Sequence, residues 1–368
     1  MDTAPPSTVG PQDIVTPVLP RVETLRRLIG PSLAAALSGL ACEPCWAQAP
    51  VVDATGRDIR PPAKVERVYA AGPPASMLVF AIAPDKLTGW TRAFRANEAE
   101  FVPPKYAALP ELGRLTGRGN TANVEVVLKA KTDLIVDIGS TGATLASLAS
   151  QVQQQTGIPY ALLDGRIEST PASFRALGKL MGDEARAEQL AAWYEKELQE
   201  ARSRAARASS KPKVYYGRGP AGLQTGGKGS INVEVLEFLG AQNVAAEARA
   251  GLVTVSIEQI LLWDPEVVLT TDPEFWRAAW TDPRWRAVTA VEKKRVFLSP
   301  HLPFGWFDFP PGANRLLGIW WAGKLLYPEA FNVDLRAKVI EFHRLFYHRK
   351  PTAAQLDALL GEPGVLPQ

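Results

Sequence analysis

The chain has 368 residues, of which 46% are hydrophobic and 21% are charged, and its formal net charge is +3. This is the balance of an ordinary globular protein, long enough for one large or two medium α/β domains. The small net charge gives no indication of nucleic acid as a partner, and we expect none.

Residues 1–49 have the pattern of a secretory signal and not of a folded domain. A segment with several arginines precedes a short apolar run at residues 33–37, and Ala47-Gln48-Ala49 supplies a small-x-small cleavage site. This is the order of regions in a signal peptide. We therefore expect cleavage before Pro50 and a mature protein that is soluble in the periplasm. A membrane anchor is disfavoured because the apolar run is too short to span a bilayer.

The two cysteines of the chain, Cys42 and Cys45, both lie in this leader. Lipid attachment at Cys42 is an alternative to simple cleavage, but the three residues before it match the lipoprotein pattern poorly. The C-x-x-C spacing is also found in redox and zinc sites. The chain has no second pair of cysteines, and the leader is expected to be removed. We therefore favour neither a redox site nor a zinc site.

The mature chain begins with a strand–loop–helix pattern. Residues 65–70 predict a first core strand, and a Gly-Pro-Pro loop at residues 72–74 leads into an apolar helix that ends near Ala83. Open α/β sheets bind ligands at loops of this kind, which follow the carboxyl ends of strands. Four arginines in the next segment are either solvated or form a basic rim on this lobe: Arg92, Arg95, Arg114 and Arg118.

A long helix is predicted from Gly182 to Ser209. Asp183 is suited to cap its N-terminus, apolar residues recur at helical spacing, and no proline or glycine interrupts it. About 25 residues at ~1.5 Å each give a length of ~38 Å, roughly the width of a small domain. The length is that of a strut between two lobes.

A pattern of short helix, acidic residue and buried strand occurs on both sides of this helix. One short predicted helix carries Glu125 and is followed eight residues later by Asp133 and a strand; another carries Glu258 and is followed eight residues later by Glu266 and a strand. A glutamate in a first helical turn also suits the helix dipole, which could explain each case alone. The matched pair indicates two lobes of one design, with Glu125 and Glu258 in equivalent places.

The second lobe is predicted to begin with a strand at residues 213–216. The Gly-rich loop at residues 217–230 does not match the phosphate-binding or dinucleotide-binding fingerprints, so we do not expect a nucleotide. Residues 301–315 form an aromatic and proline-rich loop, which either plugs a core or faces a ligand. An amphipathic helical tail from Asp334 to Leu360 is expected to pack back onto the second lobe.

We therefore expect an α/β protein of two Rossmann-like lobes, joined by a single long rigid helix, with a ligand cleft between them. The expected segments are a leader (1–49), an N-terminal lobe (50–170), a connecting helical segment (171–210) and a C-terminal lobe with a helical tail (211–368).

The order of these segments resembles the periplasmic substrate-binding proteins of ABC importers for ferric siderophores, haem and cobalamin. The resemblance covers nearly the whole mature chain and rests on residues 51–62, 123–136, the long helix, 230–243 and 256–269. It implies two α/β lobes joined by one rigid helix, with the ligand held between them. It also implies that one glutamate of each lobe docks onto arginines of the membrane permease, and these match Glu125 and Glu258.

The resemblance implies an iron chelate of the ferric siderophore type as ligand, with transfer to a permease. The loop from Pro303 to Arg315 and the extended tail look like a branch that includes molybdate and tungstate binders, so such an oxyanion is the alternative. Guanidinium groups suit both kinds of ligand because they bind oxygen pairs bidentately. We expect no enzyme activity, no cofactor and a monomer.

Two other classes of site are disfavoured by the residues present. Free Zn²⁺ or Mn²⁺ would need several converging histidines and carboxylates, and the histidines of the chain are His301, His343 and His348. An exported hydrolase would have to use His301 with Asp308 and Ser299, without a G-x-S-x-G motif. The expected ligand-binding residues lie at carboxyl ends of predicted strands or in the late loop: Arg118, Tyr216, Arg218, His301, Trp306 and Arg315.

Overall fold

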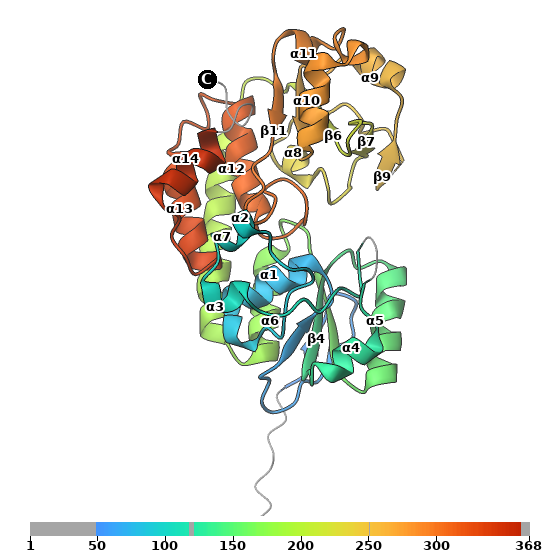
Figure 1. Ribbon diagram of the computed structural model, residues 1–368, viewed down its shortest axis with the longest axis vertical. Coiled ribbons are helices and arrows are strands. Elements are labelled where there is room, and N and C mark those ends of the chain that lie inside the picture. Colours follow the sequence, from blue (N-terminus) through green and yellow to red (C-terminus); the bar gives the residue numbers. More distant parts are fainter. Residues whose placement is uncertain (1–48, 118–120, 250, 362–368) are drawn as a thin grey trace, which may run out of the picture. The chain divides into compact units, whose positions relative to one another are not determined.

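Two parallel β-sheets, each covered by helices, form the framework of the protein (Figure 1). The computed structural model describes residues 49–117, 121–249 and 251–361. Residues 1–48, which include Cys42 and all of the expected leader except Ala49, therefore lie outside the described residues, as does Arg118. No helix in the described part of the chain is long and apolar enough to cross a membrane.

The first sheet belongs to the N-terminal lobe and has the order β3 (Val68–Ala70), β4 (Leu134–Gly139), β5 (Tyr160–Asp164), all parallel. Residues Leu134 to Ile138 of the central strand are all buried, as expected for a strand covered on both faces. The main helices of this lobe are α1 (Pro73–Ile82), α5 (Ala143–Thr156) and α6 (Thr170–Met181). The shorter elements are β1 (Val51–Val52), β2 (Asp58–Ile59), η1 (Pro84–Lys86), α2 (Ala96–Ala99), α3 (Pro104–Ala107) and α4 (Val124–Lys129).

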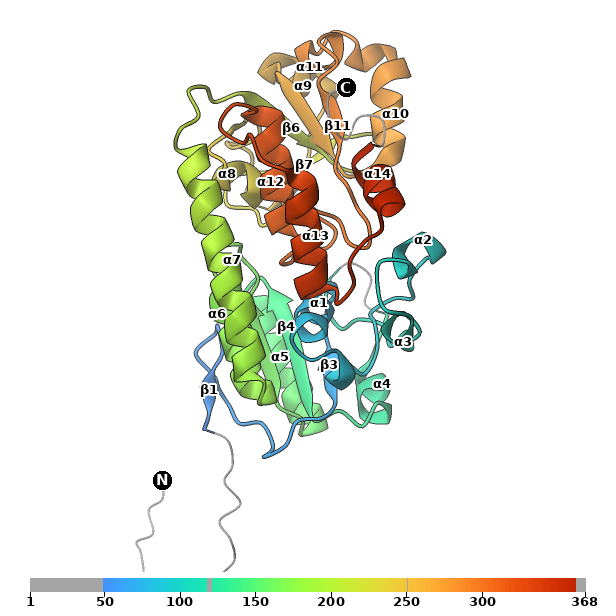
Figure 2. The same cartoon turned by 90° about the vertical axis from the view of Figure 1, so that its left-hand side faces the viewer.

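The long helix α7 (Glu184–Ala205) lies within the predicted range and leads from the first lobe to the second (Figure 2). Its buried face includes Leu190 and Tyr194, as the helical spacing predicts. Asp183 does not cap the helix with its side chain. Its carboxylate pairs instead with the Lys86 ammonium at 2.5 Å, which fastens the start of α7 to the first lobe.

The second sheet has the order β11 (Val296–Leu298), β10 (Val267–Thr270), β6 (Lys213–Gly217), β8 (Gln242–Asn243), again all parallel. A small antiparallel ribbon is formed by β7 (Gln224–Gly226) and β9 (Leu252–Thr254). The helices of this lobe are α8 (Glu234–Phe238), α9 (Ile257–Trp263), α10 (Pro273–Thr281), η2 (Pro283–Trp285) and α11 (Thr289–Glu292). The chain ends with α12 (Arg315–Leu326), α13 (Leu335–Phe346) and α14 (Ala353–Gly361).

The helical tail does not pack on the second lobe alone. Figure 2 shows α12 and α13 beside α7, and the rings of Phe342 and Phe346 contact Trp193 of α7. Beyond α13, the His348 ring lies 2.8 Å from the carbonyl oxygen of Phe80 in α1. The apolar face of α13 thus packs against α7, which contributes Trp193 to the contact. The residues directly after α13 contact the first lobe.

Candidate functional site

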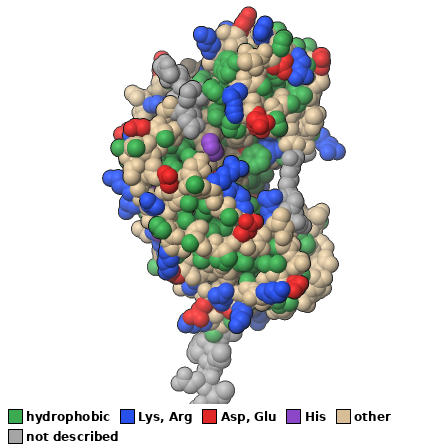
Figure 3. Space-filling model, viewed as in Figure 1, with side chains coloured by type: hydrophobic (Ala, Val, Ile, Leu, Met, Phe, Trp, Pro, Cys, Tyr) green, Lys and Arg blue, Asp and Glu red, His purple; other side chains and the backbone are tan. Residues whose placement is uncertain are grey.

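A cavity of about 470 Å³ is lined by residues that follow the strands of both sheets. From the first lobe it receives Gly72 to Pro74 after β3 and Ser140 after β4. From the second it receives Arg218 after β6 and the loop Asp308 to Pro311. Figure 3 shows a recess between the upper and lower parts of this face, with Lys and Arg side chains at its edge. The cavity therefore occupies the crevice where open α/β sheets bind ligands.

Arg218 contributes a buried positive charge to the cavity wall. Its Nε lies 2.8 Å from an oxygen of Asp308, an ion pair without linear hydrogen-bond geometry, and both side chains are buried. Its Nη1 donates to Gln224 at 2.6 Å. None of the described residues accepts a hydrogen bond from Nη2, so this nitrogen is the part of the guanidinium that can meet a ligand.

Asp308 is held by four neighbours at once. Besides Arg218, the Tyr216 hydroxyl donates to it at 3.1 Å, the Asn232 amide at 2.9 Å and the backbone N–H of Phe309 at 2.9 Å. Burial next to the Asp308 charge raises the pKa of Tyr216 well above its ordinary value, so the phenol stays a donor. This network fixes Arg218 in place before any ligand arrives.

Arg92 and Arg114 bring positive charge from the first lobe. Both terminal nitrogens of Arg92 donate to the two oxygens of Glu98 at 2.7 Å. Glu98 is buried, whereas the Arg92 side chain is 52% exposed. Burial raises the pKa of Glu98, but the hydrogen bond from Arg92 and the backbone N–H of Arg95 outweigh it and leave the pKa lowered. The acid thus positions an exposed guanidinium at the cavity.

Aromatic rings form the apolar walls. Phe94 lies 4.8 Å from Trp90 and 5.7 Å from Phe304, centroid to centroid, so this cluster joins the two lobes. Phe309 is not part of this cluster: the residue is 54% exposed, and the centroid of its ring lies 4.3 Å from the guanidinium carbon of Arg218. Its φ of +56° is unusual for a bulky residue, and such strain is concentrated at functional sites.

Asp137 is a buried acid in the cavity wall with no cationic partner among the described residues. It accepts hydrogen bonds from the Thr116 hydroxyl at 3.1 Å, the Ile138 N–H at 2.9 Å and, more weakly, the Tyr160 hydroxyl at 3.4 Å. Burial raises its pKa despite these donors. A Cβ on Gly72 would lie 2.7 Å from the Thr116 oxygen, so the loop before α1 needs glycine to approach this pair.

The structure brings only part of the predicted site to the cavity. Arg218 lines it, and so do Thr116 and Gly117, next to the undescribed Arg118. Tyr216 and Trp306 are fully buried, and Tyr216 supports Asp308 from behind. His301 is partly buried and does not line the cavity.

Arg315 ties the two lobes together and does not line the cavity. Its Nη1 donates to Glu234 at 2.5 Å and to the Ile231 carbonyl at 3.0 Å, both in the second lobe. Its Nη2 donates to the carbonyl of Gly165, directly after β5 of the first lobe. The guanidinium is fully buried, and its ion-pair partner is Glu234.

The grouping considered for a hydrolase is not assembled. The Ser299 hydroxyl donates to the carbonyl of Pro300 at 3.2 Å, and Asp308 belongs to the Arg218 network. No group of three or more His, Cys, Asp or Glu side chains in the described residues is placed to hold a metal ion.

Sequence reasoning missed Asp137, Asn232 and Phe309 as cavity residues. Asp137 interrupts an apolar strand, which is a usable indication of a special environment for an acid. Asn232 follows the Gly-rich loop, and nothing in the sequence distinguishes it from other loop residues.

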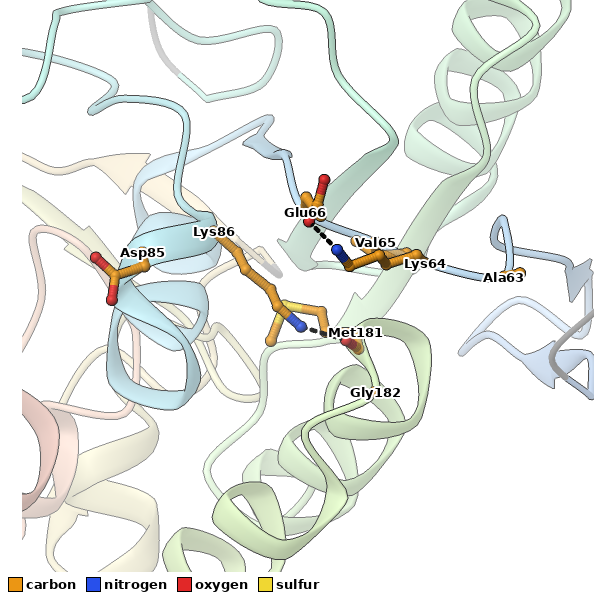
Figure 4. Close-up of a pocket in the computed structure, with 8 residues that line it drawn as sticks. All are labelled: Ala63, Lys64, Val65, Glu66, Asp85, Lys86, Met181 and Gly182. Carbon is orange, nitrogen blue, oxygen red and sulfur yellow. Dashed lines mark hydrogen bonds and ion pairs between the residues drawn. The ribbon is translucent and has the colours of Figure 1, made fainter.

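A second hollow of about 460 Å³ lies at the amino end of β3 (Figure 4). Its charged residues are already paired: Lys64 with Glu66, and Lys86 with Asp183 and the Met181 carbonyl. It lies away from the carboxyl ends of the strands, and we do not assign it a ligand.

The two glutamates singled out by the repeat are exposed on short helices. Glu125 stands in the first turn of α4, which the Asn123 side chain caps, and it pairs with Lys129 at 2.8 Å. Glu258 stands in the first turn of α9, which Ser256 caps. Figure 1 shows both helices on the side of their lobe away from α7.

A family model described as periplasmic binding protein matches residues 92–301. The chain belongs to this family. As a periplasmic binding protein it is a substrate-binding protein of the kind that serves ABC transporters, and it is not an enzyme.

The fold of two parallel-sheet lobes is confirmed by solved structures of this kind. An ABC transporter solute-binding protein from Sulfurospirillum deleyianum is 29% identical, with a TM-score of 0.77 over 85% of this chain and 99% of that chain. The structure of MolA from Haemophilus influenzae with bound molybdate is 22% identical, with a TM-score of 0.67 over 82% of this chain and 99% of that chain.

Two curated relatives carry different ligands in their names. The molybdate-binding protein MolA of Haemophilus influenzae is 36% identical over 128 residues, which is 34% of this chain and 36% of MolA, so that match spans about a third of the relative. The vitamin B12-binding protein of Vibrio cholerae is 26% identical over 262 residues, which is 68% of this chain and 85% of that protein. Family membership therefore leaves the ligand to be argued from the cavity.

Proposed function

We propose that this periplasmic binding protein captures a tetrahedral oxyanion of the molybdate or tungstate type and delivers it to an ABC permease. The observation that carries the proposal is the convergence of Arg92 and Arg114 of the first lobe with Arg218 of the second on one cavity. Guanidinium groups bind pairs of oxyanion oxygens through parallel N–H donors. The 36% identity to molybdate-binding MolA over part of the chain supports the same ligand class.

The polar groups around Arg218 suit an anion that carries no hydrogen. The Asn232 amide and the Ser140 hydroxyl line the same cavity and can donate to oxyanion oxygens. Asp308 also lines the cavity, but its oxygens already have four partners, and its charge is balanced by the Arg218 guanidinium. The nitrogen Nη2 of Arg218 is then the strongest donor that the second lobe offers.

A ferric siderophore-type chelate is the second candidate because of the size and walls of the cavity. Its volume of about 470 Å³ is more than a bare tetraoxoanion needs. Trp90, Phe94 and Phe309 offer flat apolar surfaces against an organic scaffold. An anionic chelate would use the same arginines.

Calorimetry on the purified mature protein tests these two ligands against each other. Molybdate and tungstate are titrated in parallel with sulfate, a ferric trihydroxamate and a ferric tricatecholate. The proposal predicts a dissociation constant in the micromolar range or below for molybdate or tungstate, and weaker binding of both chelates. Tight binding of a chelate, with no heat from either metal oxyanion, would replace the first candidate by the second.

Delivery requires contact with the permease, and we propose that Glu125 and Glu258 provide it. They stand in equivalent helices of the two lobes, both are exposed, and neither lines the cavity. We also propose that the mature protein is soluble in the periplasm after cleavage before Pro50. Mass analysis of the exported protein tests this, since an intact leader or a lipid on Cys42 would contradict it.

A further inference from the structure

Large apolar side chains are rarely exposed in the described part of this protein. Those that are exposed are Val52, Leu128, Leu262 and Phe309. Phe309 faces the ligand cavity, and Val52 belongs to the short ribbon at the start of the mature chain. Leu128 is 49% exposed and Leu262 is 80% exposed, and these two lie on α4 and α9, the helices that carry Glu125 and Glu258.

Each leucine lies one helical turn after the glutamate of its helix. Leu128 follows Glu125 by three residues, and Leu262 follows Glu258 by four. Side chains at these spacings are neighbours on a helix surface, with Cβ atoms about 5–6 Å apart. Each lobe therefore presents a carboxylate and a leucine side by side toward solvent.

Packing of the two helices does not require these leucines. The fully buried side chain of α4 is Val127, and that of α9 is Ile260, so each helix already has an apolar anchor in its own lobe. A single exposed leucine is normal on a protein surface. Two exposed leucines, one on the glutamate-bearing helix of each lobe and each about one turn from an exposed glutamate, indicate a shared use.

We infer that Leu128 and Leu262 are the apolar half of the docking surface for the permease, an inference that rests on the proposed docking role of Glu125 and Glu258. The partner is the surface of the membrane permease. It would carry two sites, one for each lobe, and each site would place a basic group beside an apolar pocket. The carboxylate steers and orients such a partner, and the leucine is removed from water in the complex.

In the sequence, each of the two helices follows a segment that contributes residues to the ligand cavity. The segment before α4 carries the cavity residues Thr116 and Gly117, and the segment before α9 carries the cavity residue Leu252.

The test measures docking of the full mature protein to its permease in nanodiscs, with no ligand added. Leu128→Ser and Leu262→Ser are compared with Val52→Ser, a substitution of another exposed apolar residue. Each leucine variant is expected to dock about tenfold more weakly, the effect of ~1.4 kcal/mol, whereas Val52→Ser stays within twofold of the parent. Because no ligand is present, a wrong ligand assignment does not affect the result.

Glu125→Gln and Glu258→Gln in the same assay separate the possible failures. If they weaken docking while both leucine variants dock like the parent, the apolar contact does not exist and the inference is overturned. If none of the four substitutions weakens docking, both the inference and the proposed docking role of Glu125 and Glu258 are wrong. A second copy of this chain is the other possible occupant, and sedimentation of the parent and the leucine variants tests it. If the parent were a dimer and the substitutions converted it to a monomer, the leucines would belong to a dimer interface and the inference would be overturned.

Discussion

Arg218 is the residue for which the sequence and the cavity agree most closely. Its position directly after β6 is readable from the sequence, because the carboxyl ends of parallel strands face the ligand crevice. Its restraint by Asp308 is not readable, since the two residues are ninety positions apart in the chain. The ion pair has consequences for both binding and stability.

Replacing Arg218 by methionine should weaken oxyanion binding by ~10- to 100-fold, the effect of losing one charge-assisted hydrogen bond. It should also lower the free energy of unfolding by about 3–5 kcal/mol, because Asp308 is left buried without its cation. Calorimetry and urea denaturation measure the two effects.

The double variant Arg218→Met, Asp308→Asn is the control for the charge left behind. It should recover much of the lost stability, while its oxyanion affinity should remain low. Unchanged affinity in both variants would contradict a role of Arg218 in binding, and the ligand would then be sought among neutral or apolar molecules.

Asp137 predicts a pH dependence of stability with a definite sign. Its folded pKa is raised because the side chain is buried, and the facing groups Thr116 and Tyr160 supply hydrogen bonds but no positive charge. The folded protein therefore holds a proton that the unfolded chain loses above about pH 4. Stability falls from there as the pH rises toward the folded pKa, and it does not fall further above it.

Asp137→Asn should remove this decline. The difference in free energy of unfolding between variant and parent should grow in favour of the variant between about pH 4 and the folded pKa, and then stay constant. Urea denaturation at a series of pH values measures it. Parallel curves for the two proteins across pH 4–8 would show that Asp137 does not titrate as its burial implies.

Residues such as Tyr216, Trp306 and Arg315 show where residue-level prediction stops. All three are buried and do not line the cavity, although each lies near the carboxyl end of a strand or in the segment of residues 301–315. The position of a residue along a predicted strand shows at which end of the sheet the residue lies. The direction of a loop side chain depends on partners far away in the sequence, and those cannot be read from one sequence.

At the scale of elements, α12 and α8 are joined to the first lobe by one buried arginine. Arg315 contacts Glu234 and the carbonyl of Gly165, and Glu234 also accepts a hydrogen bond from the N–H of Ile167 at 3.2 Å. Burial raises the pKa of Glu234, and Arg315 holds that rise in check. This small network lies at the junction of the lobes.

Arg315→Met should therefore destabilise the protein by up to about 3 kcal/mol, because Glu234, whose side chain is 16% exposed, is left without its cation. Adding Glu234→Gln should restore a large part of that loss, since glutamine can still accept the Ile167 hydrogen bond and carries no charge. Urea denaturation of the single and double variants is the measurement. If the single variant were as stable as the parent, Arg315 would not be the tie between the lobes.

The elements themselves were largely predictable. Apolar periodicity identified the long helix, and buried β-branched runs identified β4 and β10, because both patterns arise locally. The packing of α13 was not predictable. An amphipathic stripe shows that a face is buried, but which surface covers it depended on Trp193, a residue of the linking helix.

At the scale of the whole molecule, the proposed docking surface separates transport from ligand capture. Glu125 and Glu258 are exposed, belong to different lobes and do not line the cavity. Substitution of either should change the encounter with the permease, and it should leave the geometry of the arginines around the ligand as it is.

Glu125→Lys and Glu258→Lys should each lower the rate of uptake into vesicles that contain the permease, while ligand affinity stays within about twofold. Glu184→Lys is the matched control, since Glu184 is exposed and also stands in the first turn of a helix. The defect should shrink as salt is raised toward 1 M, where the screening length falls to about 3 Å. Loss of ligand binding in either docking variant, or an equal defect in Glu184→Lys, would show that these glutamates act through the fold and not through the permease.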